Sequence, residues 1–212
     1  MDEALYHKNI LITTASFPPV SYLKTLLFAE KAYIEQYENY IKQSYRNRYV
    51  IAAANGLLSL SIPVVLATNK KIKVKDVKID YDTNWQKQHF KSIESAYRNS
   101  AFYDYIIQDF EPFFSKKVPF LLDFNLQVLN VVQDIADFKV YYSLTTGFVM
   151  HPENCHDLRN QIHPKKHSDL SFDFKEYPQV FVEKYGFKPD LSCLDLIFNL
   201  GNETHAYLIG KY

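Results

Sequence analysis

The feature that most constrains the fold is a strand–helix–strand pattern close to the N-terminus. The run from Asn9 to Ala15 is short, apolar and rich in β-branched residues, which predicts a buried strand. Pro18 and Pro19 end this run, and apolar residues then recur with helical spacing over residues 20–27, so a helix follows. Residues 32–37 predict a second strand. Because the connection is short, we expect two parallel strands joined by a right-handed crossover.

Turn signals and periodicity predict the later elements. Asn55-Gly56 is a two-residue turn signal between two apolar runs, so a β-hairpin is expected from residues 49–54 and 57–65. Residues 72–79 predict an edge strand whose lysines share one face. The other expected elements are helices over residues 84–97, 102–114, 119–136 and 191–199, and a strand over residues 139–144.

The C-terminal helix has recognisable end signals. Asp190 is placed to cap its start, and Gly201 lies just past its end. Residues 147–179, rich in proline and polar clusters, predict a long loop. The pattern as a whole predicts a single domain over residues 1–212. Its fold class is α/β, a mixed sheet with an N-terminal parallel βαβ unit, a β-hairpin and several helices.

Composition excludes several classes of protein. Only five glycines occur, and their spacing rules out the glycine-rich phosphate loops and the nucleophile elbow. With 24 basic and 24 acidic residues there is no basic field to bind nucleic acid. The chain has no apolar stretch long enough to span a membrane and no signal-peptide pattern at its start. We therefore expect a cytoplasmic protein that binds neither nucleic acid nor membrane.

Two segments are candidates for an anion site. Ligands of open parallel sheets bind beyond the carboxyl ends of the strands, which here lead into residues 16–22 and 40–48. The first is a helix start with free N–H groups. In the second, Lys42, Arg46 and Arg48 are spaced to hold a phosphate or carboxylate. The alternative is a solvated basic turn that pairs with Glu35 or Glu38.

Two helices carry polar residues that need an explanation. Asn125 lies among apolar helical neighbours, so its amide is expected to be buried and to have a partner. It is either a structural amide that holds a loop or part of a ligand site. Asp195 and Asn199 share a polar stripe on the last helix, which either lines a cleft or faces water.

Histidines and a cysteine gather between His151 and His167. Their spacing fits no common zinc pattern, so no metal site is predicted. Cys155 beside His156 could suggest a thiol nucleophile, but adjacent residues rarely face each other. The sequence names no cofactor.

Four segments in order resemble the WbqC-like family of bacterial proteins. They are residues 17–22, 42–48, 85–97 and 191–201. The chain departs from the family pattern at Ser21, where a glycine is expected. The residues that match are Tyr22, Lys42, Arg46, Asn47, Arg48, Trp85, His89, Tyr97, Asp195 and Asn199.

This resemblance implies a function in the synthesis of surface-polysaccharide (O-antigen type) precursors. It implies a transferase that modifies an amino sugar on a nucleotide-activated precursor, by acyl or aminoacyl transfer. His89 or Asp195 would then be the catalytic base. The residues expected to bind the ligand or its anionic group are Tyr22, Lys42, Arg46, Asn47, Arg48, Tyr97, Asn125 and Asn199.

Two other functions stay open at this point. The same basic segment suits a non-catalytic protein that binds a nucleotide-sugar or another anionic ligand, and the chain would also suit a structural accessory subunit. For the transferase and for the non-catalytic binding protein alike, the expected partner is a small anionic molecule. The substrate and the oligomeric state are left open by the sequence.

Overall fold

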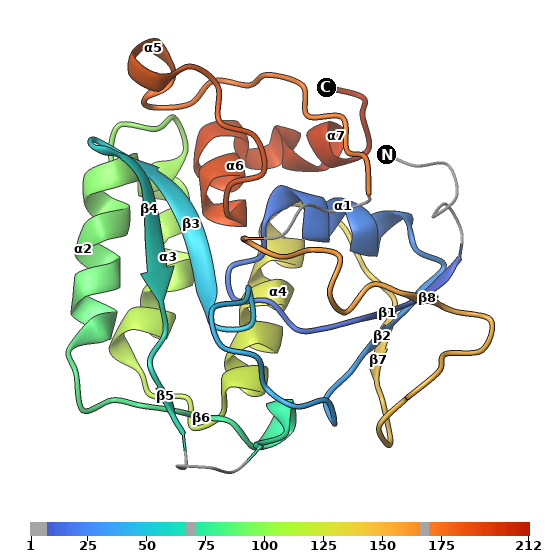
Figure 1. The fold of residues 1–212 in the computed structure, drawn as a ribbon. Coiled ribbons are helices and arrows are strands. Elements are labelled where there is room, and N and C mark those ends of the chain that lie inside the picture. The colour runs from blue at the N-terminus through green and yellow to red at the C-terminus, as the bar shows by residue number, and fades with distance from the viewer. Residues whose placement is uncertain (1–7, 67–70, 166–169) are drawn as a thin grey trace.

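A computed structural model describes residues 8–66, 71–165 and 170–212. Its larger sheet has four parallel strands in the order β7-β2-β1-β8 (Figure 1). They are β1 (Asn9–Ile12), β2 (Lys31–Ile34), β7 (Tyr142–Leu144) and β8 (His156–Asp157). Helix α1 (Val20–Phe28) joins the first two, so the predicted parallel βαβ unit is confirmed. Residues 1–7 and His167, which entered the sequence analysis, lie outside the described residues.

The predicted hairpin is also confirmed, and it forms an antiparallel ladder of its own. Its strands are β3 (Arg48–Ala53) and β4 (Gly56–Ser61). The turn lies one residue earlier than the Asn55-Gly56 signal indicates, because Ala53 pairs with Gly56 and the turn holds Ala54 and Asn55. The left-handed backbone falls on Gly56, with φ of 104°, which glycine adopts without a steric penalty.

The strand predicted over residues 72–79 is largely wrong. These residues hold the 3₁₀ helix η2 (Val74–Asp76) and only a short strand, β6 (Lys78–Ile79), which pairs with β5 (Val64–Val65). Val74 and Val77 are both fully buried. A spacing of three residues puts them on one side of a 3₁₀ turn but on opposite faces of a strand, which explains the difference.

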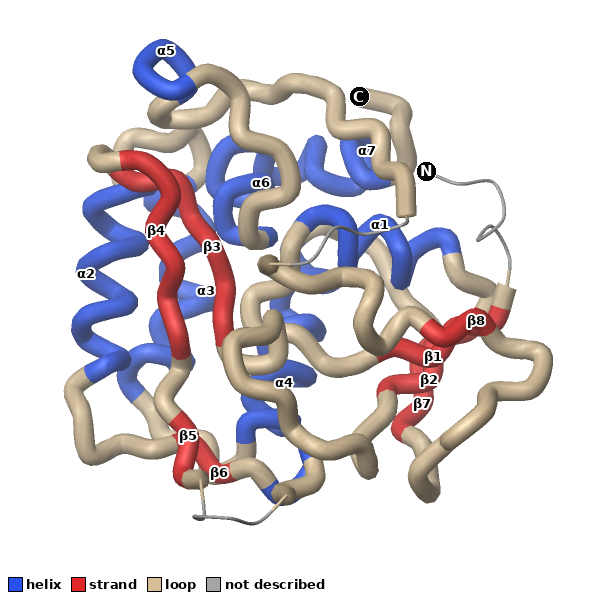
Figure 2. Tube along the Cα trace, in the orientation of Figure 1, coloured by secondary structure: helices blue, strands red, loops and turns tan. Residues whose placement is uncertain are grey.

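Helices predicted from periodicity are confirmed. They are α2 (Trp85–Tyr97), α3 (Tyr103–Ser115), α4 (Leu121–Ile135) and α6 (Cys193–Leu200). Three short elements follow or precede α6: α5 (Val182–Tyr185), η3 (Gly201–Glu203) and α7 (Thr204–Leu208). Figure 2 shows the hairpin and α2 on one side of the molecule and the parallel sheet on the other, with α4 between them. Within the described residues, no helix has the length and apolar character needed to cross a bilayer.

A group of aromatic rings fixes the carboxyl end of β1 against the helices. Phe17, which is fully buried, lies 4.6 Å from the Tyr49 ring and stacks at 5.7 Å on Phe114. It also contacts Phe110, Phe113 and Phe124. Many of the aromatic residues are therefore core residues, and this packing fixes where the chain turns from the sheet into α1.

Helix α6 is capped differently from the prediction. Gly201 does end α6, with φ of 52°. At the other end Ser192, not Asp190, is the N-cap, and its Oγ accepts a hydrogen bond from the Leu194 N–H. The Asp190 side chain bonds the start of α1 instead, and its backbone has a left-handed φ of 56°.

Candidate functional site

The carboxyl ends of the parallel strands carry a set of buried polar side chains. β1, β2 and β7 are followed directly by Thr13, Glu35 and Thr145. Glu38, Arg46 and Arg159 come from the loops that continue from this edge, and all six side chains are buried. We call these six residues the edge cluster. This is the position at which open parallel sheets bind ligands.

A buried ion pair forms the centre of the edge cluster. Arg46 donates from Nε at 3.0 Å and from Nη2 at 2.7 Å, in both cases to Glu38 Oε1. The Thr13 hydroxyl donates to the same oxygen. The side chain of Arg46 is 1% exposed and that of Glu38 is 8% exposed. Within residues 8–66, 71–165 and 170–212, no hydrogen bond reaches Glu38 Oε2 or Arg46 Nη1, so each partner keeps an unused hydrogen-bonding position there.

The second acid of the edge cluster is fully bonded. Glu35 Oε1 accepts from the Thr145 hydroxyl at 2.9 Å, and Oε2 accepts from the Val149 N–H at 2.9 Å. Arg159 Nη1 lies 3.8 Å from Oε2 and donates to the Val149 carbonyl at 2.7 Å. Arg159 also pairs with the carboxylate of Asp157. Glu35 therefore holds the loop after β7 in place. The edge cluster as a whole contains two carboxylates and two guanidinium cations.

The basic segment is neither a solvated turn nor a clamp of three free cations. Arg46 is buried against Glu38, one of the two pairing partners considered from the sequence. Arg48 is half-buried, and its Nε donates to Ser61 Oγ at 3.1 Å. Lys42 is exposed. Asn47 donates to the Ile62 carbonyl at 2.8 Å, while its buried Oδ1 has no partner in the described part of the chain.

Asn125 and Tyr22 bond to backbone carbonyls of edge-cluster residues. Asn125 Nδ2 donates to the Arg46 carbonyl at 2.8 Å, and its Oδ1 lies 2.6 Å from Ser16 Oγ. This matches the structural alternative for Asn125, an amide that holds a loop. The Tyr22 hydroxyl donates to the Thr13 carbonyl at 2.7 Å. Both residues therefore fix the backbone beside Arg46 and Glu38.

His89 lies apart from the edge cluster, between α2 and the hairpin. Its Nδ1 is 2.9 Å from the Tyr49 hydroxyl, and the ring also bonds the backbone of Ser61. Trp85 packs edge-on against it at 5.0 Å. Burial lowers the pKa of His89 to about 4, so the imidazole is neutral at pH 7.

The buried His89 makes stability depend on pH. Because its pKa in the folded state is depressed, its contribution is present above about pH 6.5 and is lost as the pH falls toward 4. We expect wild type to lose up to about 3 kcal/mol more than His89→Gln over this range. Denaturant unfolding at several pH values measures the difference, and equal pH slopes for the two proteins would contradict it.

Asp195 belongs to a different buried network, together with Tyr97 and Asn199. Its Oδ2 accepts from the Tyr177 hydroxyl at 2.6 Å and from Gln179 Nε2 at 2.7 Å. Burial raises the pKa of Asp195, and hydrogen bonds from the neighbouring side chains oppose that rise. Asn199 Nδ2 donates to the Asp195 carbonyl at 2.7 Å, and Ala52 N–H donates to the Tyr97 hydroxyl at 3.3 Å. Within the described residues, His89 makes no hydrogen bond to any member of this network.

The N-terminus of α1 is occupied by the chain's own carboxylate. Asp190 accepts from the Ser21 N–H at 2.7 Å and from the Ser21 hydroxyl at 2.9 Å. This is the anion-binding position that the sequence indicated. A cavity of about 530 Å³ opens beside it, and Tyr45, His163 and Lys165 are among its lining residues.

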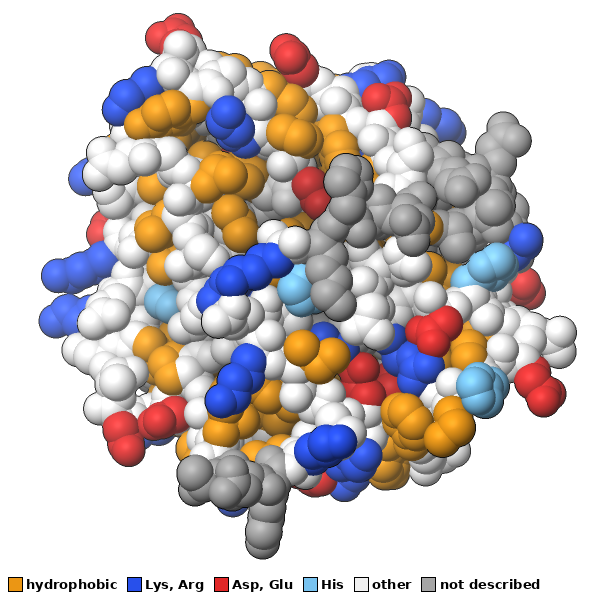
Figure 3. Space-filling view, in the orientation of Figure 1, with side chains coloured by type: hydrophobic (Ala, Val, Ile, Leu, Met, Phe, Trp, Pro, Cys, Tyr) orange, Lys and Arg blue, Asp and Glu red, His pale blue; other side chains and the backbone are white. Residues whose placement is uncertain are grey.

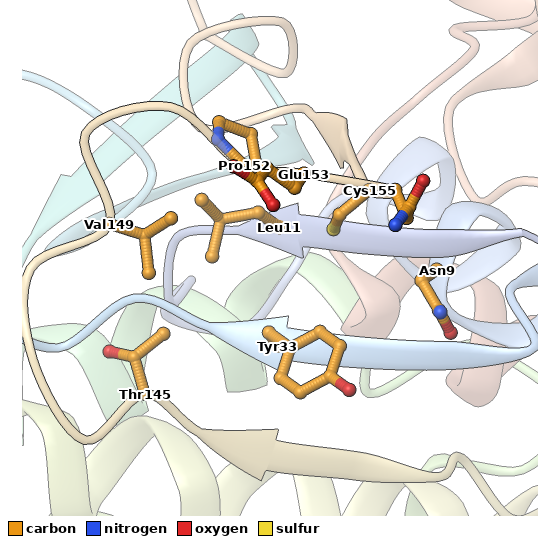
Figure 4. A pocket seen from close by; sticks show the side chains of 9 residues that line it. Asn9, Leu11, Tyr33, Thr145, Val149, Pro152, Glu153 and Cys155 are labelled. Carbon is orange, nitrogen blue, oxygen red and sulfur yellow. The ribbon is translucent and has the colours of Figure 1, made fainter.

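A second cavity of about 230 Å³ lies on the sheet face away from α1 and α4. Figure 4 shows Leu11 and Tyr33 on the strands, with Val149 to their left and Pro152 and Cys155 toward the top. This slot borders the residues that bond Glu35 and is mostly apolar. Burial raises the pKa of the Cys155 thiol above its ordinary value, so this cysteine is not an activated nucleophile.

No metal ligand set is present in the described ranges, where no group of three or more His, Cys, Asp or Glu side chains could hold an ion. Figure 3 shows acidic and basic side chains next to one another, beside hydrophobic ones, on the face of the molecule that it draws.

Sequence reasoning missed Glu35, Glu38 and Arg159 as members of one site. The two glutamates were considered only as pairing partners of a basic turn. Both predicted strands end three residues later than β1 and β2 do, so Thr13 and Glu35 fell inside them and not at the edge where ligands bind. Arg159 carried no sequence signal, since β8 is two residues long and lies in a segment predicted to be a loop.

Comparisons with known proteins agree with the resemblance seen in the sequence. The model of the family described as "WbqC-like protein family" matches residues 14–165. The chain is 25% identical over 230 residues to "Uncharacterized protein Rv1507c" of Mycobacterium tuberculosis, covering 95% of this chain and 97% of that protein. No solved structure matches the chain.

Proposed function

Because this chain belongs to the WbqC-like protein family, we propose that it is a transferase of bacterial surface-polysaccharide precursor synthesis. The reaction would be acyl or aminoacyl transfer to an amino sugar. The nucleotide-linked substrate would bind at the carboxyl edge of the parallel sheet, in the cytoplasm. One observation carries this proposal: the edge cluster gathers two buried acids and two buried bases at the ligand-binding edge of the sheet.

The cost of burying these charges supports a functional reason for them. Each ion taken from water costs several kcal/mol, and a well-packed apolar core avoids that cost. Among the residues that the structure describes, nothing bonds to Arg46 Nη1 or Glu38 Oε2, so a ligand with an anionic group and a hydroxyl or ammonium group can bond to both.

The other predicted residues fit around this arrangement as proposals. Lys42 and Arg48 are accessible cations on the same segment as Arg46 and would attract the phosphates. Tyr22, Asn47 and Asn125 would position the segment through their backbone contacts. The described slot beside Glu35 offers room for an apolar group of acyl size.

Roles for the residues of the two separate networks stay predictions. His89 is a neutral base, but both of its hydrogen-bonding sides are engaged by Tyr49 and Ser61. Asp195 and Tyr97 are fully buried, and Asn199 nearly so. A catalytic or ligand-binding role for these residues requires that a bound substrate break the hydrogen bonds that enclose them.

Ligand-induced stabilisation tests the proposal. We expect nucleotide-sugars to raise the melting temperature, since a ligand at a hundred times its Kd adds about 2.7 kcal/mol of stability. Removing both accessible cations, in Lys42→Gln/Arg48→Gln, should reduce this shift and its dependence on salt. Lys87→Gln on α2 is the matched control, because Lys87 is also exposed but distant in sequence from the edge.

The outcomes separate the candidate functions. No shift with nucleotide-sugars or acyl-CoA would contradict the transferase and the binding protein alike. Mass spectrometry of the protein mixed with both substrates shows whether a group is transferred. A rise in melting temperature without any group transfer would favour a non-catalytic binding protein.

A further inference from the structure

The cavity beside α1 combines one polar end with aromatic walls. Its volume is about 530 Å³, which lies within the range of small-molecule sites. Ser21 and Asp190 form the polar end, and Tyr45, Phe172 and Phe174 supply rings. Sugars present C–H faces that pack on aromatic rings and polar groups that bond to carboxylates. The chemistry of the lining therefore suits a sugar.

Asp190 is held rigidly and still has bonding capacity. Ser21 donates once to each of its oxygens, which leaves a second lone pair on both. These are the hydrogen bonds of Asp190 within the described ranges. The carboxylate therefore lies at the border of the cavity with its orientation fixed by the first turn of α1.

The groups around Asp190 leave it able to take up a proton. Burial raises its pKa to about 6, while the two bonds from Ser21 lower it. Burial raises the pKa of the Tyr45 and Tyr207 hydroxyls, and the charge of Asp190 adds to the rise at each. His163 and Lys165 line the same cavity and are its other titratable groups. A carboxylate of this kind is ionised at pH 7.5 and accepts a proton at little cost.

We propose that this cavity binds the acceptor, an amino sugar that carries an anionic group, and that Asp190 accepts the proton of its amine. This inference rests on the proposed transferase function. The bound ammonium group first gives one proton to the Asp190 carboxylate, which leaves a neutral amine. As the amine nitrogen forms a bond to the acyl carbon of a thioester donor, the C–S bond breaks. The thiolate leaves with its electron pair and takes up the second proton of the nitrogen. Lys165 is placed to attract the anionic group.

The binding of glucosamine 1-phosphate tests this assignment. We expect titration calorimetry to show binding to wild type that tightens as the pH rises through about 6, because ionised Asp190 attracts the ammonium group. Asp190→Asn should bind about tenfold more weakly at pH 7.5 and lose that pH dependence. Tyr45→Leu should also weaken binding. Asp109→Asn, which changes an exposed carboxylate on α3, is the control and should bind like wild type.

The main variant is designed to fold. Asparagine tolerates the left-handed backbone at this position as aspartate does, and its amide can keep both contacts with Ser21. Circular dichroism and the melting temperature check this directly. Equal affinity and an equal pH profile for wild type and Asp190→Asn would overturn the assignment, as would absence of binding to wild type. If nucleotide-sugars still stabilise the protein in that case, the proposed function survives and only the acceptor site is wrong.

Discussion

Replacing Arg46 with methionine is expected to lower the free energy of unfolding by about 3–5 kcal/mol. Methionine fills much of the space of the side chain but cannot pair with Glu38. Within the described part of the chain, the glutamate is then left as a buried charge with only the Thr13 hydroxyl as a donor. Denaturant unfolding monitored by fluorescence of the buried Trp85 measures this loss.

A double variant separates the ion pair from simple loss of packing. If the unpaired Glu38 charge is the cause, Arg46→Met/Glu38→Gln should recover a substantial part of the lost stability, because no buried charge remains. The single variant Glu38→Gln completes this double-mutant cycle. Equal stability of Arg46→Met and the double variant would contradict the buried pair and place the effect in packing.

Gly201→Ala is expected to destabilise the protein by several kcal/mol. A Cβ atom at this position would lie 2.5 Å from Cδ1 of the Phe102 ring, and the backbone has φ of 52° and ψ of −122°, a region that residues with a side chain rarely adopt. Phe102 cannot move freely, because its N–H bonds the Phe198 carbonyl on α6. The expected loss, about 2–4 kcal/mol, is read from denaturant unfolding.

Gly147→Ala is the matched control. An added Cβ there meets nothing within 4 Å and the backbone φ is not in the left-handed region, so its stability should stay within about 0.5 kcal/mol of wild type. A similar loss in both variants would mean that the contact with Phe102 is not the cause. Gly201 lies in the last of the four segments that resemble the family, residues 191–201. The structure gives it a packing role, since it is buried against Phe102.

The elements that the sequence predicted correctly are those specified locally. The βαβ unit follows from two apolar runs and a proline-started helix, and helices α2, α3 and α4 follow from their apolar periodicity. The wrong strand over residues 72–79 shows the limit of that reasoning. Val74 and Val77 suit either a strand or a 3₁₀ turn, and only packing against the rest of the fold decides between them.

The candidate site was predictable in its location but not in its composition. The rule for parallel sheets pointed to residues 16–22 and 40–48, where Arg46 indeed lies at the edge. Arg159 and Asp190 reach this region from far along the chain, through loops that carry no periodic signal. The sequence placed the capping role of Asp190 on the adjacent helix, since a contact with Ser21 cannot be inferred from local spacing.

The central claim is that the carboxyl edge of the parallel sheet is where the ligand binds. Hydrogen–deuterium exchange with a nucleotide-linked amino sugar, UDP-N-acetylglucosamine, tests it most directly. We expect slower exchange at backbone amides of residues 13–22 and 40–48 and no change at the tip of the hairpin. Another cavity, of about 360 Å³, lies between the hairpin tip and α2. Protection confined to that region, residues 53–58 and 91–96, would contradict the claim.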